Sequence, residues 1–284
     1  MKFYPRYLGL ILVLTFFSVA RSNSQPAPAR YKIKAVYKLE YQKDSTNPKS
    51  VREEYLQLYY GDSGSLFESF NYSMIDSAIS SETKKGNRTG PSFGFLMGMR
   101  TEFMYLIQKQ KDAIITYDYI GAYNLYSYKE ERNLFNWQIT QDTASIGGIP
   151  CQKAETIFGG RKWNAWFAPE IPISDGPYKF CGLPGLILKI TDSRNFWNFS
   201  IASISNIDTT IAPTLQNEKP EMIKSKNAYL KELKYYKDNL IDIELTRGGL
   251  KFSSSEEKDR NERIHREQRK LDNNWIEIYD GIKE

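Results

Sequence analysis

Hydrophobic and polar residues alternate along much of this chain, and a period of two is typical of β-strands. Residues 31–41 show it most clearly, with tyrosine or aliphatic side chains at odd positions and lysine or glutamate at most even ones. Turn-forming stretches separate this strand from two more, at 51–60 and 66–72, which predicts a three-stranded meander. Similar patterns predict further strands in residues 113–119, 123–128, 134–139, 195–204 and 275–279.

Two segments near the C-terminus have the pattern of a helix. Ser225 precedes apolar residues at spacings of four and three, and Ser254 forms a capping box with Glu257. We therefore predict one helix after Ser225 that lies on the sheet, and a second after Ser254 that is mostly solvated because its apolar face is narrow. Residues 76–92, rich in Ser, Thr, Lys and Gly, are expected to form an exposed loop.

The stretch from Cys151 to Asp192 combines aromatic residues, prolines and glycines. Residues 162–167 alternate as a strand with one buried face and one aromatic, partly solvated face. Prolines interrupt residues 168–180, so we expect an ordered loop there without a strand ladder.

A tight bend follows this loop. Gly182 and Gly185 flank Pro184 where the chain leaves no room for a Cβ, and the apolar run at 186–190 then predicts a central strand. We interpret the bend as a structural corner that closes a sheet.

Together these segments predict a mainly β protein. We expect residues 25–284 to form one domain, a curved antiparallel sheet that makes an open barrel or bowl with one or two peripheral helices. Aromatic residues make up 14% of the chain, with 20 tyrosines, which favours a sheet that is partly covered on both faces.

The first residues predict export. Residues 1–24 have a basic start, an apolar run too short to span a bilayer comfortably, and a small polar end, which is the layout of a secretory signal peptide. No cysteine lies near the expected cleavage site, so we expect a periplasmic or secreted protein that is not a lipoprotein. No other long apolar segment predicts a transmembrane span.

The chain has two cysteines, Cys151 and Cys181. In an exported protein an even count favours a disulfide, and closing this loop would stabilise the fold by about 3 to 4 kcal/mol. The alternative is two separately buried thiols.

Charge and residue types exclude several functions. Removing the leader's three basic residues takes the net charge from +5 to +2, which is not the balance of a nucleic-acid-binding protein. With His265 as the single histidine, we expect no metal site and no cofactor. The segment Gly61 to Gly64 resembles the nucleophile region of trypsin-like serine proteases, but no histidine precedes Ser63, so we interpret it as a hairpin turn.

The core stretch carries a family resemblance. The hexapeptide of Gly182, Leu183, Pro184, Gly185, Leu186 and Ile187 resembles the signature of the GLPGLI family, uncharacterised envelope proteins of Bacteroidetes-type bacteria, and the Asn-Asn-x-Ile-Glu ending at 273–277 also fits. The resemblance implies a bowl-shaped fold similar to the N-terminal domain of a bacterial peptide N-glycanase, without that enzyme's catalytic part. It also implies a link to TonB-dependent outer-membrane transporters.

Three functions follow as hypotheses. The first is a non-catalytic envelope protein, a periplasmic accessory or binding protein linked to TonB-dependent transport. The second is a carrier or chaperone that holds a lipid or peptide in the bowl. The third is a hydrolase that uses the carboxylates of Asp175 or Glu170. A candidate surface for a partner or ligand comprises Trp163, Trp166, Glu170, Asp175 and Tyr178.

Overall fold

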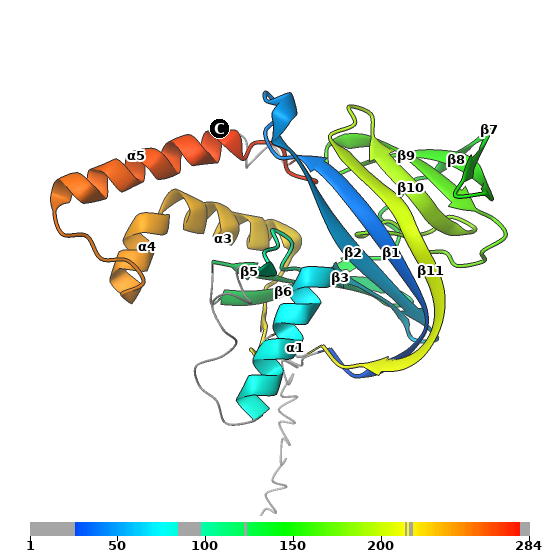
Figure 1. Ribbon diagram of the computed structural model, residues 1–284, viewed down its shortest axis with the longest axis horizontal. Coiled ribbons are helices and arrows are strands. Elements are labelled where there is room, and N and C mark those ends of the chain that lie inside the picture. The colour runs from blue at the N-terminus through cyan, green and yellow to red at the C-terminus, as the bar shows by residue number, and fades with distance from the viewer. Residues whose placement is uncertain (1–25, 85–97, 122–123, 214, 216–217, 279–284) are drawn as a thin grey trace, which may run out of the picture.

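The computed structural model describes residues 26–84, 98–121, 124–213, 215 and 218–278. Strands account for 44% and helices for 24%, and the strands form one large open sheet, so the predicted mainly β fold is confirmed (Figure 1). The predicted leader, residues 1–24, lies outside the described residues.

The sheet has twelve strands in the order β12-β6-β5-β4-β3-β2-β1-β11-β10-β9-β8-β7. All neighbours pair antiparallel except β12 and β6, which are parallel. The strands are β1 (Ala29–Gln42), β2 (Val51–Gly61), β3 (Gly64–Ser69), β4 (Leu106–Lys109), β5 (Ala113–Ile120), β6 (Asn124–Glu131), β7 (Gln138–Ile146), β8 (Ile149–Phe158), β9 (Arg161–Ala168), β10 (Leu186–Asp192), β11 (Trp197–Ile211) and β12 (Glu221–Met222).

The long strands β1, β2 and β11 form the bent centre of the sheet (Figure 1). The register between β1 and β11 shifts at Tyr31/Ile33 and again at Val36/Tyr37, and such irregularities increase local twist and bending. The odd positions of β1 are buried at Tyr31, Ala35, Tyr37, Leu39 and Tyr41, as the alternating pattern predicted.

Helices lie around the sheet. In the described part of the chain they are α1 (Phe70–Lys84), α3 (Lys226–Asp238), α4 (Leu240–Arg247) and α5 (Ser255–Leu271), with a short 3₁₀ helix η1 (Pro48–Ser50). The side chains of Ser225 and Ser254 cap α3 and α5, which confirms both predicted helices. The capping box differs in detail, because the Glu257 carboxylate accepts from the Ser253 N–H, at 2.8 Å.

Several sequence predictions were wrong. We predicted that the third strand would run to residue 72 and that a loop would start at residue 76. The chain instead forms α1, where Ser69 Oγ accepts the Tyr72 N–H and the Tyr72 ring is buried. Helix α4 was also missed. Residues 275–278 are not a strand, and the Ile278 N–H donates to Gly159 O in the β8–β9 turn, at 2.6 Å.

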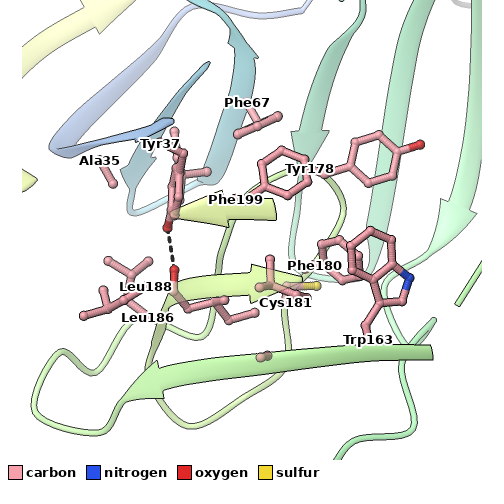
Figure 2. Packing of buried hydrophobic residues seen from close by; sticks show 14 of the residues in the cluster. Ala35, Tyr37, Phe67, Trp163, Tyr178, Phe180, Cys181, Leu186, Leu188 and Phe199 are labelled. Carbon is pink, nitrogen blue, oxygen red and sulfur yellow. Dashed lines mark hydrogen bonds between the residues drawn. The ribbon is translucent and has the colours of Figure 1, made fainter. Parts of the chain in front are cut away.

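The loop of residues 169–185, here called the motif loop, fills the inner side of the bent sheet. Its Phe180 ring packs against that of Trp163 on β9 (Figure 2), at a centroid distance of 4.7 Å. Phe180 and Leu183 are both buried in the main core. The Tyr37 hydroxyl of β1 donates to Ile187 O of β10, 2.8 Å. Because the loop reaches strands on both halves of the sheet, its side chains occupy the interior of the bowl.

Candidate functional site

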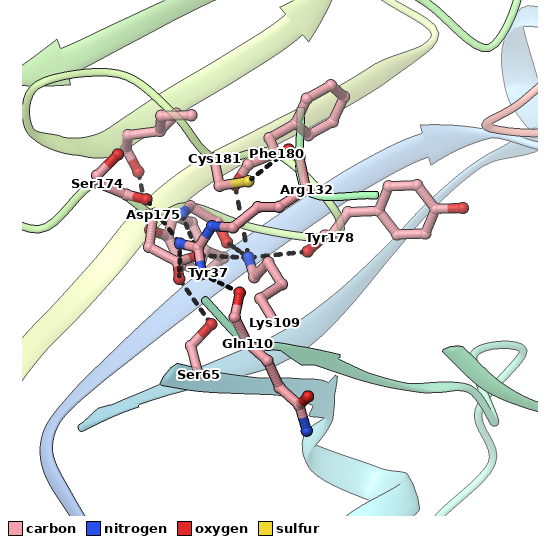
Figure 3. Close-up of polar contacts among 12 residues, drawn as sticks. Tyr37, Ser65, Lys109, Gln110, Arg132, Ser174, Asp175, Tyr178, Phe180 and Cys181 are labelled. Carbon is pink, nitrogen blue, oxygen red and sulfur yellow. Dashed lines mark hydrogen bonds and ion pairs between the residues drawn. The ribbon is translucent and has the colours of Figure 1, made fainter. Parts of the chain in front are cut away.

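Asp175 anchors the motif loop to the opposite half of the sheet. Its carboxylate forms an ion pair with Lys109 of β4, and both side chains are 0% exposed. Ser65 of β3 donates to Asp175 Oδ2 at 2.6 Å, and the Gly176 N–H donates to Oδ1 at 2.7 Å. Arg132 adds a more distant charge at 3.7 Å (Figure 3).

Lys109 also donates to the loop's backbone. Its ammonium bonds Gly176 O at 2.6 Å and Tyr178 O at 3.0 Å (Figure 3). All three ammonium hydrogens therefore have acceptors, which is the condition for burying a lysine without a large penalty. The arrangement holds a loop in place, and it leaves neither charged group open to a substrate.

A second buried network ties the loop to the C-terminal segment. Lys179 pairs with Glu130 of β6 at 2.6 Å and with Glu277 at 2.9 Å. Glu277 also accepts from the Tyr178 hydroxyl at 2.5 Å and pairs with Lys226. Burial alone would raise the pKa of Glu277, but the charges of Lys179 and Lys226 outweigh it and lower that pKa.

Arg161 holds the same C-terminal segment from the β8–β9 turn. Its guanidinium pairs with Asp192 at 2.9 Å and donates to Asn274 Oδ1 at 2.6 Å. The next residues approach this turn closely, since a Cβ at Gly159 would lie 2.8 Å from the Glu277 side chain. The Asn-Asn-x-Ile-Glu ending is thus a structural clasp on the sheet.

The five residues predicted as a partner surface do not share one. Trp163 and Asp175 are 0% exposed and Tyr178 is 6% exposed. Their side chains contribute to the core and to the buried networks. Trp166 is half-buried and Glu170 is exposed, and these two alone of the five reach solvent.

The structure does not contain the predicted disulfide. Cys151 and Cys181 are both free, buried thiols, and burial raises the pKa of each. They have separate surroundings: the Cys151 thiol points to Ile149 O of its own strand at 3.4 Å, and that of Cys181 to Arg132 O at 3.9 Å. Cys151 and Cys181 therefore fit the alternative given by the sequence, two separately buried thiols.

The tight bend of the motif is as predicted. Gly182 has a φ of +98°, and a Cβ at Gly185 would lie 2.2 Å from Ala168 O. Both positions therefore require glycine for backbone reasons. The hexapeptide marks a corner of the fold, and Leu183, Leu186 and Ile187 are core side chains.

Residues of the β1–β2 connection and of the C-terminal end of α5 line an open cleft. Its volume is about 1140 Å³. We call it the α5 cleft. It is lined by Lys43, Asp44, Asn47, Lys49, Ser50, Val51, Arg52, Glu102, Lys237, His265, Gln268, Arg269, Lys270, Leu271, Asp272, Asn273, Trp275, Glu277 and Ile278.

Basic groups outnumber acidic ones in this cleft, six to four. The acidic groups already have partners: Glu102 pairs with Lys43 and Arg52, and Glu277 with Lys179. The Asp44 carboxylate accepts from the Thr46 and Asn273 side chains. Most of the basic groups are paired as well, since Arg269 pairs with Asp238 and Lys270 with Glu267. Lys237 forms no ion pair with any described residue, so its charge is available to an anionic ligand.

Lys237, on the last turn of α3, stands out among the basic groups. Its ammonium lies 3.3 Å from the centroid of the Trp275 ring, a cation–π contact. Burial lowers its pKa to about 8, and the charge of Arg269 acts in the same direction. The α3 backbone is held against α5, because Lys237 O contacts His265 Nε2 at 3.1 Å. Sequence reasoning missed this site, since its walls come from segments far apart in the chain.

Two further features concern residues 26–84, 98–121, 124–213, 215 and 218–278. These residues contain no group of three or more His, Cys, Asp or Glu side chains placed to hold a metal ion. None of the helices within those ranges is both long and apolar enough to cross a bilayer.

Comparison with known families and structures gives a limited result. Residues 159–189 match a family described as "Protein of unknown function (Porph_ging)", which is found in Bacteroidetes. The match covers the β8–β9 turn, the motif loop and most of β10, and it does not confirm the GLPGLI name. No curated protein matches the chain.

Two solved structures are similar in fold. "Structure of PNGF-II in C2 space group" has a TM-score of 0.50 at 12% identity, over 72% of this chain and 32% of that one. "Structure of PNGF-II in P21 space group" has a TM-score of 0.49 at 11% identity, over 72% of this chain and 33% of that one. The chain thus spans about a third of the length of these structures. At this identity the first likeness supports the fold alone.

Proposed function

We propose that this chain is a non-catalytic binding protein of the cell envelope that takes a partner protein in the α5 cleft. The observation that carries the proposal is the cleft itself, open to solvent, about 1140 Å³ in volume and with more basic than acidic side chains. A charged surface on a rigid support favours association with a partner of complementary charge. Here the support is the clasp that Arg161 forms with Asn274.

The envelope location and the partner's class rest on the sequence. The leader pattern of residues 1–24 supports export, and the resemblance of the hexapeptide at 182–187 supports an accessory role beside a TonB-dependent outer-membrane transporter. We propose such a transporter as the partner.

The two alternatives receive less support from the geometry. A hydrolase that used Asp175 would need solvent access to a carboxylate that is 0% exposed and paired with Lys109. A carrier that held a lipid in the bowl would need space that Phe180, Leu183 and neighbouring core side chains occupy.

Site-specific photo-crosslinking in cells tests the proposal. A photoreactive residue at Gln268, exposed in the cleft, is expected to crosslink to an outer-membrane transporter that mass spectrometry identifies. The matched control places the same residue at Ile157, which is 78% exposed on β8 and does not line the cleft. Equal capture of the transporter from both positions, or none from Gln268, would overturn the proposal.

A further inference from the structure

Lys237 gives the α5 cleft a specific chemical preference. The Lys237 ammonium lies over the Trp275 ring. No carboxylate or carbonyl of residues 26–84, 98–121, 124–213, 215 and 218–278 accepts a hydrogen bond from this ammonium. An ammonium has three N–H donors, and one that is partly desolvated without acceptors is costly. A ligand oxygen that reached it would remove this cost.

The charges around Lys237 come from several elements. Arg269 of α5 and Lys43 of the β1–β2 connection are cationic, while Asp272 after α5 and Asp118 of β5 are acidic. Neither acid is within ion-pair distance of the ammonium, and Asp118 is engaged by the Tyr229 hydroxyl at 2.8 Å. Burial is the main reason that the pKa of Lys237 falls to about 8.

We propose that the α5 cleft binds an acidic polypeptide segment and that the Lys237 ammonium holds one of its carboxylates. The inference rests on the proposed function and names the chemistry of the partner's contact. The cleft volume of about 1140 Å³ exceeds what most small ligands fill, roughly 300 to 1000 Å³. Its walls also come from separate segments, the β1–β2 connection, the end of α3 and the residues that end and follow α5, which suits an extended chain better than a compact ligand.

Calorimetric titration with a short polyglutamate peptide, and with polyglutamine of the same length, tests this inference on the purified protein. We expect polyglutamate to bind and polyglutamine not to. Lys237→Met should weaken polyglutamate binding by about tenfold or more, because a charge-assisted hydrogen bond is lost. The matched control, Lys49→Met, removes the same charge from an exposed position of the same cleft and should change binding less than about twofold.

The pH profile separates a specific contact from general attraction. If the carboxylate binds only the protonated amine, affinity should fall by about tenfold between pH 7 and pH 9, because the pKa is about 8. In Lys237→Arg the guanidinium stays charged, so binding at pH 9 should persist. This variant also keeps the test valid if Lys237→Met folds poorly.

Three outcomes would overturn the inference: equal losses in Lys237→Met and Lys49→Met, no preference for polyglutamate over polyglutamine, or a pH profile that Lys237→Arg leaves unchanged. Displacement of the peptide by inorganic sulfate at comparable concentration would assign a small-anion site instead. A transporter crosslink that Lys237→Met does not weaken defeats this inference but not the proposed function. Peptide binding without any transporter crosslink would defeat the proposed function but not this inference.

Discussion

Asp175→Asn should destabilise the fold strongly, although the substitution keeps the shape of the side chain. The asparagine oxygen can still accept the Gly176 N–H, and the Ser65 hydroxyl can turn to accept from the amide nitrogen. The main loss is therefore the negative charge opposite Lys109. Both partners are 0% exposed, and removal of one member of a buried pair leaves the other charge uncompensated.

The magnitude follows from this burial. Breaking a buried ion pair costs about 3 to 5 kcal/mol, a large part of the roughly 5 to 15 kcal/mol by which a native domain is stable. For a chain of this size each kcal/mol corresponds to about 2 to 4 °C, so the melting temperature should fall by about 6 to 20 °C. Differential scanning calorimetry and urea unfolding at pH 7 measure both quantities.

The same loop offers a matched control. Glu170→Gln makes the same change of charge at an exposed position and should leave the melting temperature close to that of the wild type. Lys109→Met should also be strongly destabilising, and the double variant with Asp175→Asn should lose less than the sum of the single losses. A loss below about 1 kcal/mol in Asp175→Asn, together with loss of function, would refute the structural role and favour the hydrolase alternative.

Three further predictions concern the bend, a buried acid and the thiols. Gly185→Ala should cost about 1 to 3 kcal/mol in urea unfolding because its Cβ would meet Ala168 O at 2.2 Å. The control is Gly98→Ala, whose Cβ would meet no neighbour within 4 Å, and equal effects of the two substitutions would contradict the backbone argument. Burial raises the pKa of Glu68 to about 8, so the folded state keeps a proton that the unfolded state releases near pH 4. The contribution of Glu68 to stability should therefore fall as pH rises from about 4 to 8. Glu68→Gln should flatten that dependence in urea midpoints at pH 5 and 8.5, and an unchanged slope would argue against the shift. Intact-mass analysis after alkylation in denaturant should show Cys151 and Cys181 both labelled, and an unlabelled, oxidised pair would restore the disulfide.

Local patterns predicted much of the fold because strand and helix signals are read over a few neighbouring residues. The alternation in residues 31–41 identified β1, and Ser225 and Ser254 identified the starts of α3 and α5. Gly182 was predictable from local geometry because its φ is +98°, whereas the obstacle to a Cβ at Gly185 is Ala168 O of β9, which the fold brings there. Helix α1 was missed because its stabilising contact, the buried Tyr72 ring beside Tyr119, comes from elsewhere in the chain.

The candidate site shows where sequence reasoning stopped. Trp163, Asp175 and Tyr178 have the residue types of a ligand surface, yet the fold turns them inward. There Lys109 pairs with Asp175, and Glu277 accepts from the Tyr178 hydroxyl. Partners so distant in sequence cannot be paired from spacing alone.

The sequence by itself determined the strands, two helix starts and the glycine bend, because each depends on backbone geometry within a short segment. The tertiary structure decided which charges are buried, that the two cysteines are free, buried thiols, and that Lys237 meets Trp275 in a cleft built from separate segments. Burial and charge pairing depend on which distant segments meet, and the packing of the curved sheet around the motif loop determines that.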